Sequence, residues 1–293
     1  MSLERIQQAI AYIEAHLDEE IHYDQLARHV RMSGYDFHRM FSFVVGMTVG
    51  EYVRNRRLTL AAQELQSTGL SVTEAAYKYG YESLEGFSKA FSRFHGVTPK
   101  QARQQGATLR LFSPLVIRMV MEGGQMMDYR MEHRDEQRFV ALTRTFPNEI
   151  VSDDQDHSIP DFWTECGDKG LLEPMQRLRP AGKRDLYGLC SASGENGKHF
   201  NYGIGVLLDE ETVDAGKLLD GGYTLWETKP ADYAVFQCFG KDGDCIGETW
   251  SRFFREFVPQ TGYTQTDETD FELYFEKSRS DLFCELWIPV KKG

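Results

Sequence analysis

Apolar positions in the first hundred residues recur at helical spacing. The first stripe follows alternating steps of three and four residues and consists of Leu3, Ile6, Ile10, Ile13 and Leu17, which predicts one amphipathic helix. Further stripes predict helices at 24–30, 33–45 and 48–66, with Ser33 as an N-cap. The chain therefore begins with an all-helical region.

One of these helical segments is repeated at an offset of 50 residues. The matching positions are Ser33 with Ser83, Phe37 with Phe87, Phe41 with Phe91, Gly46 with Gly96 and Thr48 with Thr98. Each copy combines a short helix, a tight turn and an N-capped helix with three apolar anchors. This arrangement predicts a helix-turn-helix used twice, and a plain bundle of packed helices stays open as the alternative.

The rest of the chain alternates strand-like and helical patterns. Strand-like runs lie at 126–133, 137–146, 185–191, 200–208, 223–229, 232–239, 271–276 and 282–289, and helical patterns lie near 158–170 and 245–258. The order β-β-α-β-β occurs twice, which predicts an α+β domain of two pseudo-twofold halves. We expect an all-α domain at 1–107, a connection at 108–125 and the α+β domain at 126–293.

Charge is distributed unevenly over the 293 residues. The net charge is −12, but residues 1–110 carry 13 basic and 12 acidic side chains, so the excess acid lies in the second region. A near-neutral helical region binds DNA only if its basic residues share one face. The five cysteines form no C-x-x-C pair, and no run of eighteen apolar residues exists. We therefore expect reduced thiols, a cytoplasmic location, no membrane span and no metal site.

Four segments of the first region carry a family resemblance. SGYDFHRMF, GMTVGEYVRNRRL, AAYKYGYES and FSKAFSRFHGVTPKQAR resemble the AraC/XylS family of transcription regulators. The resemblance covers about 100 residues and implies a double helix-turn-helix that binds double-stranded DNA. Most members carry this part last, whereas this chain carries it first, as the Rob-like members do.

The first reading helix offers a polar set once its apolar anchors are set aside. This outward set consists of Tyr35, His38, Arg39 and Ser42. The resemblance implies that the first three read bases, with Arg39 bidentate to guanine, a contact worth about 1–3 kcal/mol of discrimination. Arg54, Arg56 and Arg57 on the next helix are candidate phosphate contacts, with ordinary surface or intramolecular ion pairs as the alternative.

The second reading helix differs at the matching positions, which are Leu84, Glu85, Gly86, Ser88 and Lys89. Glu85 can accept from cytosine but repels phosphate, so we expect a weaker reader. The linking helix of about 18 residues spans about 27 Å, which lets one chain reach two successive major grooves. Binding to DNA as a monomer is therefore feasible.

Motifs of the second region resemble the GyrI-like effector-binding domain. They are the runs at 230–236, 271–274 and 284–290, the last reading Cys-Glu-Leu-Trp-Ile-Pro-Val. The resemblance implies a cleft for small cationic or aromatic molecules with Glu285 at its floor. Trp287 shares the strand face of Glu285, and an ordinary strand Glu paired with an Arg is the alternative. Further lining candidates are Trp163, Tyr187, Tyr202, Tyr233 and Phe275.

These features favour a one-component transcription regulator of the multidrug-response type, with a small-molecule effector and no cofactor. RNA polymerase is a further candidate partner. Some GyrI-like domains hydrolyse reactive electrophiles with a carboxylate and a tyrosine, so a hydrolase is the first alternative. A protein-interaction module with a filled cleft is the second. We expect no enzyme, because the sequence shows no catalytic residues with a trustworthy spacing.

Overall fold

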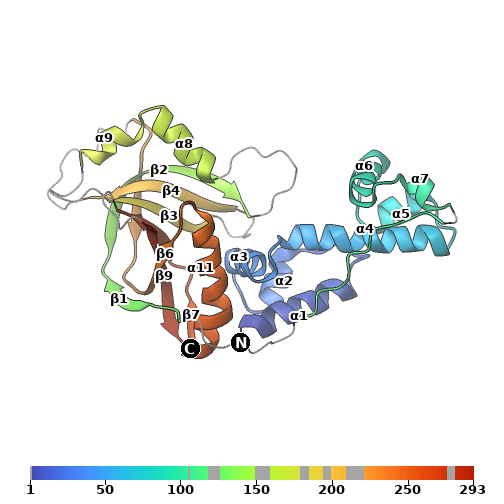
Figure 1. Ribbon diagram of the computed structural model, residues 1–293, viewed down its shortest axis with the longest axis horizontal. Helices are drawn as coiled ribbons and strands as arrows, with labels where there is room; N and C mark the ends of the chain where they lie inside the picture. Colours follow the sequence, from blue (N-terminus) through green and yellow to red (C-terminus); the bar gives the residue numbers. More distant parts are fainter. Residues whose placement is uncertain are drawn as a thin grey trace. The chain divides into compact units, whose positions relative to one another are not determined.

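The computed structural model describes residues 2–104, 106–117, 126–148, 159–178, 185–193, 199–208, 221–275 and 281–293 (Figure 1). The chain divides into two compact units. The first contains Leu3–Met32 and Val45–Met121, and the second contains Ser33–Val44 and Glu122–Gly293. Helix α3 (Gly34–Val45) therefore lies almost wholly in the second unit, although the sequence analysis places it in the domain at 1–107.

The first unit is helical, as the sequence predicts. Its helices are α1 (Ser2–Ala15), α2 (Tyr23–His29), α4 (Val49–Ser67), α5 (Val72–Lys78), α6 (Leu84–His95) and α7 (Pro99–Ala102). Reciprocal capping boxes start three of them, with Thr48 and Glu51 opening α4 and Ser71 and Glu74 opening α5. These side chains satisfy backbone N–H groups that have no partner inside the helix, which fixes where each helix begins.

The second helix-turn-helix forms its own core. Ala75 and Ala76 of α5 and Phe87 and Phe91 of α6 are fully buried with residues of α4. The two alanines let α5 approach its neighbours closely. The turn before α6 passes through Gly80 at φ 77°, a left-handed conformation that glycine adopts without steric cost.

The arginines of α4 differ sharply in exposure. Arg56 is buried, forms two 2.8 Å hydrogen bonds to the carboxylate of Glu14, and also donates to the backbone oxygen of Phe112. Arg57 donates to the backbone oxygens of Leu17 and Glu19. The intramolecular alternative therefore holds for both side chains in this structure, whereas Arg54 is exposed.

The second unit combines strands with helices in a doubled order. Its first half contains β1 (Arg130–Arg134), β2 (Gln137–Pro147), α8 (Ile159–Asp168), α9 (Leu172–Gln176), β3 (Leu186–Ser193) and β4 (His199–Leu207). Its second half contains β5 (Thr224–Thr228), β6 (Ala231–Phe239), α11 (Asp244–Arg252), the π-helix η1 (Phe253–Phe257), α12 (Val258–Thr261), β7 (Tyr263–Gln265), β8 (Asp270–Tyr274) and β9 (Leu282–Lys292). The predicted strands are all present, and β7, α9 and α12 are additions.

The sheet shows the predicted pseudo-twofold relation. Its strand order among the described residues is β1-β6-β9-β8-β3-β4-β2-β5, with β7 pairing β9. The counterparts in the two halves are β1 and β5, β2 and β6, β3 and β8, and β4 and β9. If each strand is replaced by its counterpart, the same strand order is obtained, read from the opposite edge of the sheet. The pair β3 and β8 therefore lies at the pseudo-axis, and each half contributes one strand to the centre of the sheet.

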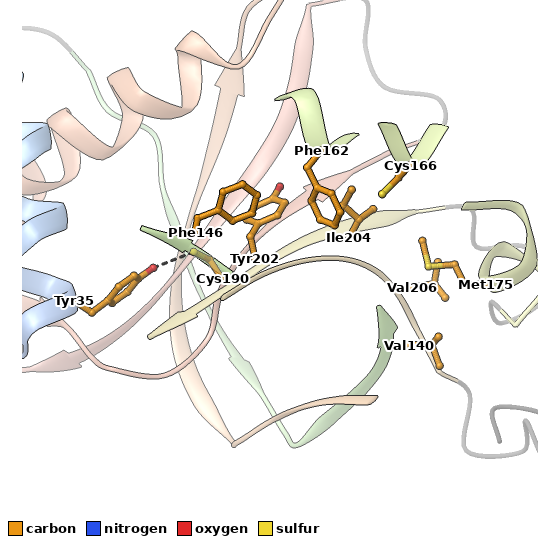
Figure 2. Close-up of a cluster of buried hydrophobic side chains, with 10 residues drawn as sticks. All are labelled: Tyr35, Val140, Phe146, Phe162, Cys166, Met175, Cys190, Tyr202, Ile204 and Val206. Atoms are coloured by element: carbon orange, nitrogen blue, oxygen red, sulfur yellow. Dashed lines mark hydrogen bonds between the residues drawn. The ribbon is translucent and has the colours of Figure 1, made fainter. Parts of the chain in front are cut away.

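Two apolar clusters lie on the strands of this sheet. One gathers side chains of α8, α9 and β4 with Val140, Phe146 and Cys190, and Tyr35 of α3 joins it (Figure 2). The other contains Phe139, Tyr187, Trp226, Tyr233, Phe271 and Trp287. Because strand side chains alternate between faces, residues one position apart contribute to different clusters.

Candidate functional site

Strand β8 alternates polar side chains with buried apolar ones. Phe271 and Leu273 enter the cluster that contains Trp287. Asp270, Glu272 and Tyr274 therefore point to the opposite face, toward α3 and α8. This alternation places two carboxylates about 7 Å apart on one side of the central strand pair.

Glu272 is held by hydroxyl groups. The hydroxyl of Tyr202 donates to Glu272 Oε2 at 2.6 Å, and that of Tyr274 donates to the same oxygen at 3.2 Å. Trp163 Nε1 donates in turn to the Tyr202 hydroxyl at 2.9 Å. The rings of Trp163 and Tyr274 meet edge to face, 5.1 Å apart. A half-buried carboxylate thus sits among three amphipathic aromatic side chains.

Gly188 makes this arrangement possible. It is the register partner of Glu272 across the central strand pair. A Cβ atom at this position would overlap both Glu272 Oε2 and the hydroxyl of Tyr202. The glycine therefore leaves the space in which the carboxylate and the phenol meet.

The protein surroundings change the acidity of Glu272. Desolvation by the surrounding protein raises its pKa to about 7, and the neighbouring Asp270 charge adds to the rise. The hydroxyls of Tyr202 and Tyr274 and the charge of Arg39 oppose it. Glu272 consequently exchanges its proton near neutral pH, and its charged form gains from any cation brought close.

Asp270 has a different partner. Its Oδ1 accepts a 2.6 Å hydrogen bond from Arg39 Nη1, and the two side chains are 2% and 13% exposed. Burial raises the pKa of the Asp270 carboxyl, and the Arg39 guanidinium opposes that rise. Asp270 is thus compensated by a fixed positive charge, whereas Glu272, within the described residues, accepts hydrogen bonds from the hydroxyls of Tyr202 and Tyr274.

The structure separates the predicted ligand residues into two groups. Trp163 and Tyr202 lie together at Glu272. Tyr187, Tyr233 and Trp287 belong to the other cluster, against which Phe275 packs in part. Tyr233 also donates to the backbone oxygen of Thr269 at 3.1 Å. The residues predicted to line one cleft therefore do not form one site.

Glu285 is already paired with an arginine in this structure. Arg130 donates to both of its carboxylate oxygens at 2.7 Å, which is the paired alternative. The cations near Trp287 are also protein side chains, with Arg134 placed 4.4 Å from the ring centroid. A carboxylate already bound in a fork is a poor anchor for a ligand cation. The candidate anchor is therefore Glu272, which the sequence analysis missed within the 271–274 motif that it quoted.

The second reading helix presents its predicted positions to solvent. Leu84 is 43% exposed, Glu85, Gly86 and Lys89 are exposed, and Ser88 is half-buried. The N-cap Ser83 accepts from the backbone N–H of Gly86, which orders the first turn. The side chains predicted to read bases therefore line the accessible face of α6.

The first reading helix behaves otherwise. Tyr35 and His38 are buried, and Ser42 is half-buried. Arg39 pairs with Asp270, and its guanidinium lies 3.8 Å from the centroid of the Trp250 ring. The expectation that these side chains point outward is thus wrong for this structure, because strands and helix α11 of the same unit cover Tyr35 and Arg39. Their role in reading DNA stays a prediction.

Comparison with known proteins connects these two regions to families. Residues 26–105 match a family described as a helix-turn-helix domain, and residues 127–291 match one described as a GyrI-like small molecule binding domain. Over 100 residues, the chain is 38% identical to the regulatory protein SoxS of Escherichia coli K12, which covers 34% of this chain and 94% of the relative. The chain belongs to the AraC-type regulators.

Two further likenesses concern the GyrI-like part or the whole chain. The right origin-binding protein of Escherichia coli K12 is 23% identical over 301 residues, which is 98% of both chains. A solved structure of a transcription regulation protein from Staphylococcus aureus MU50 is 20% identical, with a TM-score of 0.44 over 57% of this chain and all of that one. The two family matches show that the AraC-type regulator joins a helix-turn-helix DNA-binding region to a small-molecule binding domain.

Other kinds of site find no support in the described parts of this AraC-type regulator. No group of three or more His, Cys, Asp or Glu among the described residues is arranged to hold a metal ion. No described helix is long and apolar enough to cross a membrane.

The raised pKa of Glu272 predicts how stability depends on pH. The protonated form is favoured in the folded protein, so the wild type loses stability as the pH rises from about 4.5 to about 7. Glu272→Gln removes this loss, and we expect it to gain about 2 kcal/mol over the wild type between pH 5 and pH 8. Thermal unfolding of both proteins at the two pH values measures the difference.

The matched control for this prediction is Glu227→Gln, which changes an exposed acid of the same sheet. It should not reproduce the gain in stability that is expected for Glu272→Gln. A constant difference between Glu272→Gln and the wild type from pH 5 to pH 8 would show an ordinary carboxyl at 272.

Proposed function

We propose that this AraC-type regulator binds an aromatic cation beside Glu272 and reads DNA with α3 and α6. The observation that carries the first part is the environment of the carboxylate. Within the described residues, Glu272 is bonded to the hydroxyls of Tyr202 and Tyr274 rather than to a lysine or an arginine. Its charged form is therefore under-compensated, and a ligand cation supplies the missing charge.

The neighbouring rings define the class of ligand. Trp163 and Tyr274 stand edge to face beside the acid, and both rings attract cations through their faces. Their apolar surface also favours a ligand with aromatic groups of its own. An anionic ligand is disfavoured, because the carboxylates of Asp270 and Glu272 lie on the same strand face and repel negative charge. We infer a monovalent cation with flat, apolar substituents.

Sensing, rather than hydrolysis, fits the chemistry of Tyr202. Burial and the Glu272 charge raise the pKa of Tyr202 well above its ordinary value. Its hydroxyl therefore remains protonated, donates to Glu272 and does not act as a nucleophile at neutral pH. The relatives of the first region are transcription regulators. We therefore propose an effector site without turnover.

The DNA-binding proposal assigns base reading to two helices. On α6 the readers are Leu84, Glu85, Gly86, Ser88 and Lys89, and on α3 they are Tyr35, His38, Arg39 and Ser42. Arg54 contacts phosphate, and Arg57 does so only if it leaves its backbone partners. The same proposal includes binding to DNA as a monomer and contact with RNA polymerase. It also includes the division of the chain into domains at 1–107 and 126–293, with a connection at 108–125.

Calorimetric titration with tetraphenylphosphonium tests the effector site. We expect binding to the wild type that is about tenfold weaker at pH 6 than at pH 8, because Glu272 has to lose its proton before the cation pairs with it. Glu272→Gln should lose this binding and its pH dependence.

Two controls sharpen the titration. Glu285→Gln removes the paired carboxylate on the other strand face and should bind like the wild type. The uncharged triphenylphosphine oxide should bind weakly to every variant. Equal affinity of the wild type and Glu272→Gln for the cation would contradict the proposed site.

A salt titration tests the DNA-binding surface of α6. The probe is a duplex recovered by in vitro selection with the wild-type chain. Lys89→Ala should reduce the log–log slope of affinity against salt by about 1, as expected for the loss of one phosphate contact. Glu85→Gln, a neighbouring exposed acid on the same helix, should not reduce it. A wild-type slope near zero would refute phosphate contact altogether.

A further inference from the structure

Helices α3 and α6 are repeats of one motif, yet their outer faces differ. At the offset of 50 residues, Phe43 takes the place of Arg93, and Tyr35 takes the place of Glu85. Met40 similarly takes the place of Ala90. These three residues make the apolar face of α3 wider than that of α6, and a wide apolar helix face is normally covered by other protein. The sequence of α3 therefore predicts that other parts of the protein cover the helix face formed by positions 35, 40 and 43. The matching face of α6 carries Glu85, Ala90 and Arg93 instead.

Trp250 of α11, which lies in the same unit as α3, supplies part of that cover. The ring of Phe43 stacks on the ring of Trp250, with centroids 5.7 Å apart and planes inclined by 8°. The guanidinium of Arg39 lies over the same ring at 3.8 Å while it pairs with Asp270. One tryptophan and one carboxylate thus satisfy both the apolar and the charged parts of the helix face.

Both ends of α3 are held as well. The hydroxyl of Ser251 donates to the backbone oxygen of Phe43 at 2.9 Å, and Arg255 donates to the backbone oxygen of Val44. Near the other end, Tyr35 points toward Cys190 of β3, with 3.0 Å between its hydroxyl and the sulfur (Figure 2). These contacts come from β3, α11 and η1, so a composite surface matches the helix.

The contact with Asp270 excludes the function proposed for Arg39. A guanidinium that reads guanine donates to O6 and N7 from the same fork that here donates to a carboxylate. Arg39 is 13% exposed in this pair, so a base cannot reach it. Resting on the proposed DNA-reading role of α3, we propose that Asp270 and Trp250 form a docking surface that competes with DNA for this helix.

The docking surface adjoins the proposed effector site. Asp270 and Glu272 share one face of β8, and both Asp270 and Arg39 act on the charge of Glu272. A ligand cation at Glu272 repels Arg39 and so weakens its hold on Asp270. Release of α3 leaves the acids more negative and strengthens cation binding. Effector and DNA therefore favour each other reciprocally.

The test compares the DNA affinity of three proteins of 293 residues, the wild type and two variants, on the duplex selected with the wild type. Asp270→Asn removes the acceptor charge of the docking surface. Asp135→Asn is the matched control, because it removes one negative charge from an acid that is 96% exposed in the same unit. We expect Asp270→Asn to bind about fivefold or more tightly than the wild type, and Asp135→Asn to bind as the wild type does.

Amide hydrogen exchange on the same proteins tests the docking of α3 in the absence of DNA. In Asp270→Asn the amides of 34–45 should exchange faster, while those of β3 and β8 keep their protection. Equal DNA affinity of Asp270→Asn and Asp135→Asn would overturn the docking proposal, and so would unchanged exchange in α3. If neither the wild type nor Asp270→Asn bound any duplex, the proposed DNA reading itself would fall.

Discussion

The structure depends on how β8 accommodates two carboxylates on one face. Taking a carboxylate out of water is costly unless another group replaces the lost hydration. Asp270 obtains a guanidinium from Arg39, and Glu272 obtains the phenols of Tyr202 and Tyr274. The charge of Asp270 is therefore balanced by Arg39, whereas the charged form of Glu272 is still stabilised by any additional cation nearby. This difference turns one into a docking group and the other into a ligand anchor.

The pseudo-twofold sheet explains why the acid lies where it does. The two halves meet at β3 and β8, so residues on this pair face side chains from both halves. Tyr202 reaches Glu272 from the first half and Tyr274 reaches it from the second. Gly188 on the partner strand leaves room for them. A doubled fold thus produces a central site that neither half builds alone.

Local patterns in the sequence predict the elements well. Helical spacing and capping residues give α2, α3 and α4 close to their observed bounds, because short-range forces decide them. The β-β-α-β-β doubling likewise predicts the sheet of two halves. The exposed positions of α6 follow from its one-sided apolar pattern, since no described part of the chain covers its polar face.

The site residues were harder to predict, since partners distant in sequence decide them. Glu272 and Glu285 both lie on C-terminal strands between hydrophobic residues, and strand alternation alone does not say which one meets an arginine. Arg130 is 155 positions away from Glu285, and Arg39 is 231 positions away from Asp270. The unusual aromatic face of α3 was a signal that the helix is covered. It could have been found by comparing the two repeats position by position.

The central claim is that Glu272 is a carboxylate in need of a cation. A pH titration of its carboxyl ¹³C resonance, assigned by its absence in Glu272→Gln, tests this directly. We expect a midpoint of about 7 in the free protein and a fall of at least about one unit with saturating tetraphenylphosphonium. A midpoint near 4.5, the ordinary value for Glu, that does not change when the cation is added would contradict it.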